Sequence, residues 1–137
     1  MLEDPRYSQK FIEEASGFAG NKGLSLVPLE RDAPGRLDKV LKAGRSKIDA
    51  VVLISDRTVG NAAVVQRLIA WTNEEKLPLV GLAPVQVKQG ALLSLSPAAT
   101  GLGQQAGRLA NRILHEKVDP GALAVANPEG VDLTLNL

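Results

Sequence analysis

Several hydroxyl and carboxylate side chains stand at or just after the ends of stretches that read as buried β-strands. The stretches at 48–54, 77–82 and 91–95 are short and apolar, and the first is rich in β-branched residues. In open α/β sheets, ligands bind beyond the carboxyl ends of the strands. Carboxylates and hydroxyls at that edge can accept hydrogen bonds from a ligand's amine or hydroxyl. The candidate ligand-binding residues are therefore Ser55, Asp56, Thr58, Ala83, Ser94 and Ser96.

Asp56 is the sharpest of these candidates, because it follows the strand with the clearest pattern. A second interpretation is that Asp56 or Thr58 only caps the helix that comes next. Ser96 precedes Pro97 and can also be a plain helix cap, although a cap at the mouth of a sheet can offer a hydroxyl and free amides to a ligand carboxylate. The residues alone leave both interpretations open.

The sequence lacks the residue sets on which most catalytic and metal sites are built. It contains no Cys, so it predicts no disulfide, no thiolate metal site and no Cys nucleophile. The single His115 stands where a helix is expected to end, and a cation near the C-terminal helix dipole explains it. There is no GxGxxG after a strand, no Walker motif, no paired-carboxylate set and no Ser/His/Asp arrangement. We therefore predict no catalytic residue, no metal and no cofactor.

Asp56 also stands where a receiver domain would carry its phosphoacceptor. That chemistry needs an acidic pair at the end of a first strand to hold Mg²⁺, and this strand is missing from the sequence. The sequence therefore does not support a receiver function.

Length and composition indicate one ordinary globular domain. The chain has 137 residues, of which 45% are hydrophobic and 23% charged. Its formal net charge of +1 is spread along the chain, which argues against nucleic acid as a partner. Met1–Phe11 is charged and no apolar run approaches about 18 residues, so we expect neither an export signal nor a membrane span in this chain.

Helices and strands are expected to alternate along the chain. Helices are expected at about 5–20, 34–44, 61–76, 84–89 and 97–115, and strands at 24–29, 48–54, 77–82, 91–95 and 131–137. This order predicts right-handed crossovers and a mostly parallel sheet with helices on both faces. Residues 1–137 are expected to form a single α/β lobe whose tail, 118–137, is an irregular segment followed by a half-exposed strand.

Two helices carry specific packing predictions. Trp71 is expected to pack in the core near the end of the third helix, and the glycines at 101, 103 and 107 to allow close approach of a neighbouring element. The residues expected on the buried face of the long helix are Leu102, Ala106, Leu109, Ala110 and Ile113.

Five motifs resemble successive motifs of one known family. They are KIDAVVLISDRTV at 47–59, LPLVGL at 77–82, VKQGALLS at 87–94, GQQAGRLA at 103–110 and LTLNL at 133–137. From Asp4 onward, the chain is similar to the C-terminal lobe of ABC-transporter substrate-binding proteins of the tryptophan or aromatic amino acid type. That uncharacterised family has a type I periplasmic-binding-protein fold.

The resemblance implies two similar lobes that close on a small molecule, typically an amino acid. It puts Asp56, Thr58 and the segment 94–96 on the cleft wall of the second lobe. It implies a periplasmic or extracytoplasmic protein that serves an ABC permease. The first lobe and the strand that would precede Asp4 are absent from this sequence, and Ala98 stands where the family often carries an acidic residue.

Three functions follow from these observations. The leading hypothesis is a non-catalytic solute-binding lobe of an ABC importer, and the first alternative is a stand-alone sensor or assembly module that no longer captures solute. A small flavodoxin-like enzyme is a further alternative, and it would need a cofactor. Because a sheet that lacks its first strand exposes backbone donors and acceptors, we also expect a homodimer formed through exposed sheet edges.

Overall fold

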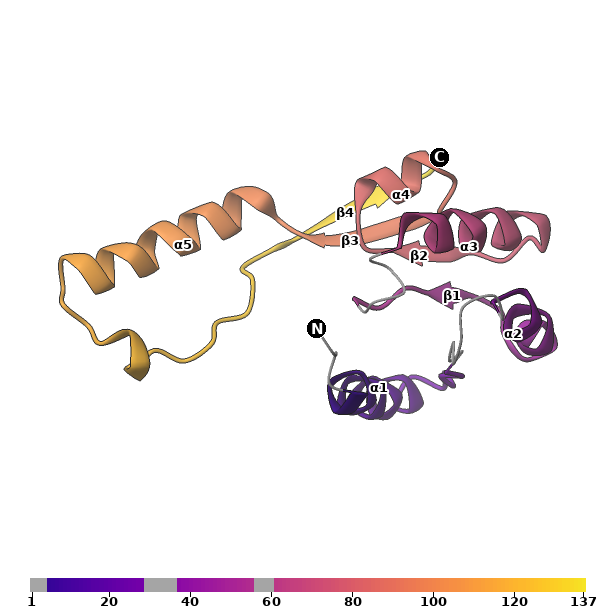
Figure 1. Ribbon diagram of the computed structural model, residues 1–137, viewed down its shortest axis with the longest axis horizontal. Coiled ribbons are helices and arrows are strands. Elements are labelled where there is room, and N and C mark those ends of the chain that lie inside the picture. Colours follow the sequence, from indigo (N-terminus) through magenta and orange to yellow (C-terminus); the bar gives the residue numbers. More distant parts are fainter. Residues whose placement is uncertain (1–4, 29–36, 56–60) are drawn as a thin grey trace.

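The computed structural model describes residues 5–28, 37–55 and 61–137. Its sheet has four strands in the order β1-β2-β3-β4 (Figure 1). They are β1 (Val51–Val52), β2 (Leu79–Gly81), β3 (Leu93–Pro97) and β4 (Val131–Leu135). The first three strands run parallel, and β4 pairs antiparallel with β3. The predicted mixed α/β fold with a mostly parallel sheet is confirmed.

Five α-helices accompany the sheet: α1 (Pro5–Gly20), α2 (Leu37–Gly44), α3 (Ala62–Glu74), α4 (Pro84–Lys88) and α5 (Ala99–Leu114). Two short 3₁₀ turns, Arg45–Lys47 and Pro120–Ala122, lie between them. The starts of α3 and α4 follow from their sequence. Asn61 caps α3 by accepting the amide of Ala63 at 3.1 Å, and Pro84 opens α4 at a position where a missing N–H costs nothing.

The core lies between one face of the sheet and the helices α2 and α3. It contains Leu41 from α2, Trp71 from α3 and Leu79 from the centre of the sheet, each no more than 4% exposed. The prediction that Trp71 packs in the core is confirmed. Arg67 in α3 bonds Asp38 in α2 at 2.9 Å and so fastens the two helices at their exposed rim.

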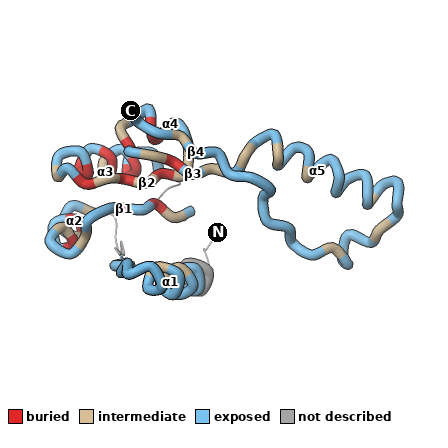
Figure 2. The backbone as a smooth tube through the Cα atoms, turned by 180° about the vertical axis from the view of Figure 1, so that it is seen from behind, coloured by how far each residue is buried: buried red, intermediate tan, exposed pale blue. Residues whose placement is uncertain are grey.

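The two faces of the sheet differ in how well they are covered. Strand register puts Val51, Leu79, Gly81 and Ser94 on one face, where all four are buried. The opposite face carries Val52, Val80, Leu93, Leu95, Val131, Leu133 and Leu135. Most of these residues are exposed, and Leu133 is 57% exposed. α1 lies across β1 from α3 in both views, but it leaves the β3–β4 half of this face open (Figures 1 and 2).

The prediction of a strand at 24–29 is wrong for its described part, because residues 24–28 have no regular structure and are exposed. Pro28 lacks a backbone donor, and no strand of the described sheet stands beside this segment. The expected strand at 48–54 is reduced to Val51–Val52 for a related reason, since within the described residues β1 has β2 as its one neighbour.

The predicted buried face of the long helix is also wrong, because no residue of α5 is buried. β3 and β4 form a two-stranded ribbon that carries α5 and the segment 115–130 away from the core helices (Figures 1 and 2). Gln105 donates to the carbonyl of Asn127 at 2.9 Å, and Arg108 pairs with Glu129, so α5 contacts the returning segment. Of the three glycines, only Gly101 is close-packed, against the Glu129 carbonyl.

Candidate functional site

Strand register brings three of the predicted site residues to the same level of the sheet. Val51 pairs with Leu79, and Gly81 pairs with Ser94. The Leu53 amide donates to the Val80 carbonyl at 2.9 Å, so the first pairing continues past the end of β1. Extended past the last paired residues, Val52 and Gly81, the same offsets align Ser55 with Ala83 and Ala83 with Ser96.

The antiparallel strand β4 adds a fourth residue at this level. Ser96 pairs with Asp132, and directly opposite residues of a strand pair point to the same face. We name the four residues the carboxyl-end row: Ser55, Ala83, Ser96 and Asp132. Ser55 and Ala83 follow the carboxyl ends of β1 and β2, and Ser96 lies in β3 one residue before its carboxyl end, the side on which α/β sheets bind their ligands. It offers two hydroxyls, one methyl group and one carboxylate.

Ser94 lies on the same face as this row but one step deeper in the sheet. Its side chain is fully buried, and its hydroxyl has no hydrogen-bond partner among the described residues. A buried hydroxyl without a partner costs free energy, typically about 1–3 kcal/mol. Ser94 therefore forms part of the floor beneath the row rather than its open surface.

Gln86 fixes the turn that carries Ala83. Its side-chain oxygen accepts the backbone amide of Leu82 at 2.6 Å and that of Ala83 at 3.2 Å, and the residue is buried. The same oxygen would lie 2.5 Å from a Cβ atom at position 81, so a larger residue there would have to displace the Gln86 side chain from these amides. The turn between β2 and α4 is thus held by a side chain and by close packing together.

Asp56 and Thr58 lie outside the described residues. Both follow Ser55 closely in the sequence, and their part in ligand binding stays a prediction. Among the described residues, no group of three His, Asp or Glu side chains could hold a metal ion.

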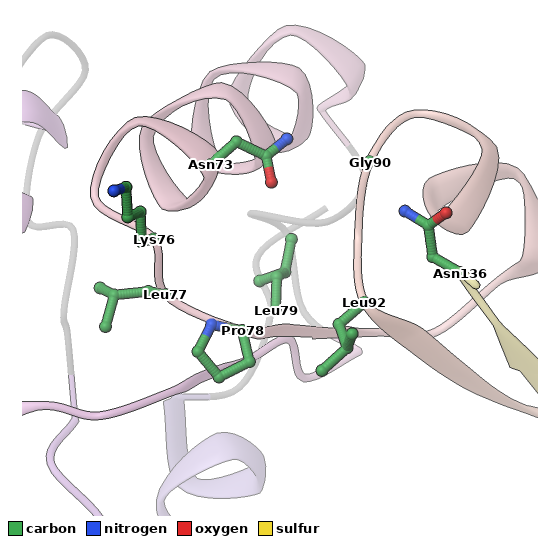
Figure 3. A pocket seen from close by; sticks show the side chains of 8 residues that line it. All are labelled: Asn73, Lys76, Leu77, Pro78, Leu79, Gly90, Leu92 and Asn136. Atoms are coloured by element: carbon green, nitrogen blue, oxygen red, sulfur yellow. The ribbon is translucent and has the colours of Figure 1, made fainter.

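A shallow hollow lies at the opposite end of the strands (Figure 3). It has a volume of about 360 Å³, and its lining residues are Asn73, Lys76, Leu77, Pro78, Leu79, Gly90, Leu92 and Asn136. This groove faces the amino ends of β2 and β3. None of the four row residues lines this hollow, and one end of a single sheet supplies only one wall of a cleft.

The fold and this row define a class: an α/β lobe with polar side chains at the carboxyl end of its parallel strands. The chain is similar to the crystal structure of a conserved domain protein from Vibrio cholerae O1 biovar El Tor, with 27% identity and a TM-score of 0.71. It is also similar to the ABC domain in complex with L-Trp from Streptococcus pneumoniae, with 19% identity and a TM-score of 0.68. Each comparison covers 93% of this chain, but only 42% and 43% of the longer chains.

The chain belongs to the ABC transporter substrate binding protein family, whose model matches residues 4–137. No curated protein matches it. The resemblance predicted from the five motifs is confirmed. Within the described ranges, no helix is both long and apolar enough to cross a membrane.

The sequence did not single out two residues that the structure places in or beside the carboxyl-end row. Asp132 alternates with apolar residues in the terminal strand, which put it on the polar side of that strand. Only the pairing of β4 with β3 brings it beside Ser96. Gln86 stands three residues after Ala83, the spacing at which a Gln side chain reaches back to the start of a helix, and this signal was available in the sequence.

Replacing Gln86 with Ala tests whether the Gln86 side chain stabilises the turn between β2 and α4. Gln86→Ala removes the acceptor for two backbone amides, so we expect the free energy of unfolding to fall by about 1–3 kcal/mol, measured by urea denaturation. Gln89→Ala is the matched control, because the Gln89 side chain is exposed, and it should change stability by less than about 0.5 kcal/mol. Equal effects of the two substitutions would show that the hydrogen bonds of Gln86 do not hold the turn.

Proposed function

We propose that this chain is a non-catalytic solute-binding lobe of an ABC importer and that its ligand is an amino acid or a similar small molecule. The observation that carries the proposal is the carboxyl-end row, which gathers polar side chains from three strand ends in a chain of the substrate-binding family. The Streptococcus pneumoniae relative, whose structure is a complex with L-Trp, supports an amino acid as ligand.

The chemistry of the row suits binding rather than reaction. Serine hydroxyls both donate and accept hydrogen bonds, so Ser55 and Ser96 can orient a polar ligand group. Ala83 adds an apolar contact, and Asp56 and Thr58, next to Ser55 in the sequence, would extend the same wall. A lobe that closes over a solute needs a shaped wall and no reactive group. Alone, it encloses at most half of a ligand, so we expect weak affinity.

The family also supports a setting for this function. We propose that the protein works outside the cytoplasmic membrane and delivers its solute to an ABC permease. The relatives of known structure are more than twice as long as the matched part of this chain, which is consistent with the second wall of the cleft coming from another lobe.

A thermal-shift screen with the twenty amino acids tests ligand binding. A ligand present at about one hundred times its Kd should raise the free energy of unfolding by about 2.7 kcal/mol, which raises the midpoint of thermal unfolding by several degrees. Asp56→Ala should abolish the shift, because it removes the predicted acceptor at the end of the strand. Asp49→Ala is the control: Asp49 is an exposed aspartate before β1, and its loss should leave the shift intact. A flat screen with the unaltered chain would argue against solute capture.

The alternative function is a sensor or assembly module, and the exposed surfaces of the sheet favour it. In the described sheet, β1 is an edge strand with no neighbour on its outer side, and the apolar face of β3 and β4 is exposed. Either surface can pair with a second copy. We propose a homodimer formed through the sheet edges.

Sedimentation velocity at micromolar concentration tests the dimer. We expect a species of twice the 14.5 kDa chain mass. Val52→Pro removes a backbone donor and adds a ring at the edge strand, so it should shift the equilibrium toward monomer. Val27→Pro, in the irregular segment before Pro28, is the control and should leave the equilibrium unchanged. A clean monomer of the unaltered chain would rule the dimer out.

A further inference from the structure

The β3–β4 ribbon has one polar face and one apolar face. Its polar face carries Ser94, Ser96, Asp132 and Thr134, which pair across the two strands. The apolar face carries leucine and valine side chains that are largely exposed, as described above. The polar face is turned toward α4: Ser94 is buried there, and its partner Gly81 lies against Gln86 of α4. The ribbon therefore presents its hydrogen-bonding groups on the side where α4 begins.

Asp132 is the one charged side chain of the carboxyl-end row. It stands opposite Ser96, and residues directly opposite in an antiparallel pair have Cβ atoms about 5 Å apart. The Asp132 carboxylate and the Ser96 hydroxyl are thus close enough to bond one ligand group together. Asp132 is exposed, so a ligand can reach it.

We propose that Asp132 is a ligand-binding residue that recognises the cationic amine of the solute. This inference rests on the proposed function. It extends that function, because it assigns a preference for a positively charged ligand group to Asp132. An ammonium group carries three donors and can bond the carboxylate of Asp132 and the hydroxyl of Ser96 at the same time.

The other common ligand groups fit this position less well. A carboxylate would be repelled by Asp132, and a neutral hydroxyl would form a weaker bond than a charged amine. The acidic residue nearest in sequence on the same segment, Glu129, already pairs with Arg108 of α5 and so has a structural partner. Asp132 accordingly selects for ligands that carry a positive charge at this end of the row.

Calorimetric titration of the full 137-residue chain tests the assignment. The probes are L-tryptophan, tryptamine, which keeps the amine but lacks the carboxylate, and indole-3-propionate, which keeps the carboxylate but lacks the amine. Asp132→Asn keeps the size of the side chain and removes its charge. It should weaken binding of the two amines about tenfold and leave indole-3-propionate unaffected or tighter. Asp49→Asn, the same change at an exposed aspartate before β1, should alter none of the three.

Each other result has a definite meaning. If the unaltered chain binds the amines and Asp132→Asn changes their affinity by less than about twofold, the role of Asp132 is wrong and the solute-binding function stands. If the unaltered chain binds only indole-3-propionate, the role of Asp132 is likewise wrong, and the solute-binding function again stands. An equal loss for all three probes, or a lowered thermal midpoint of the variant, would make Asp132 a structural residue and overturn the inference. If no probe binds, the amino-acid function fails and the inference fails with it.

Discussion

The register of the parallel strands is the constraint on which the rest of this structure depends. Backbone hydrogen bonds fix it on both sides of β2: Leu53 donates to Val80 at 2.9 Å, and Leu92 donates to Leu79 at 3.0 Å. Because side chains alternate along a strand, a slip of one residue would turn Leu79 out of the core and move the site residues to the other face. Leu79 is 1% exposed, so its burial opposes such a slip. The same register therefore determines both the burial of the core residues and the alignment of the carboxyl-end row.

Uncovered surfaces distinguish this lobe from a self-contained domain. The exposed side chains of α5 and the open face of β3 and β4 include Leu102, Leu109 and Leu133. Monomeric soluble proteins seldom expose large contiguous apolar surfaces of this kind unless another protein, another domain or a ligand binds there. The match to less than half of each longer relative fits the same picture, because those chains contain a further part that this chain does not match. The ion pair between Arg108 of α5 and Glu129 links α5 to the segment 115–130, but it buries none of the apolar residues of α5.

Sequence reasoning reached the alternation of elements, the parallel sheet, the core position of Trp71 and the family. Those features follow from local periodicity and from motifs that stand in order along the chain. It failed where a feature depends on a distant partner. Residues 24–28 carry a strand-like pattern, yet no described strand stands beside them, and the apolar stripe of α5 has no surface to pack on. Asp132 could not be placed without knowing that β4 pairs with β3. The burial of Ser94 depends in the same way on how α4 packs over the sheet.

The central claim is that solute binds at the carboxyl-end row. The most direct test is amide chemical-shift mapping of the isotopically labelled chain during titration with L-tryptophan. The account predicts that the largest shifts occur at Ser55, Ala83, Ser96 and Asp132. Shifts confined to the groove at the other end of the strands, at Asn73, Gly90 and Asn136, would contradict it, as would a spectrum that does not change.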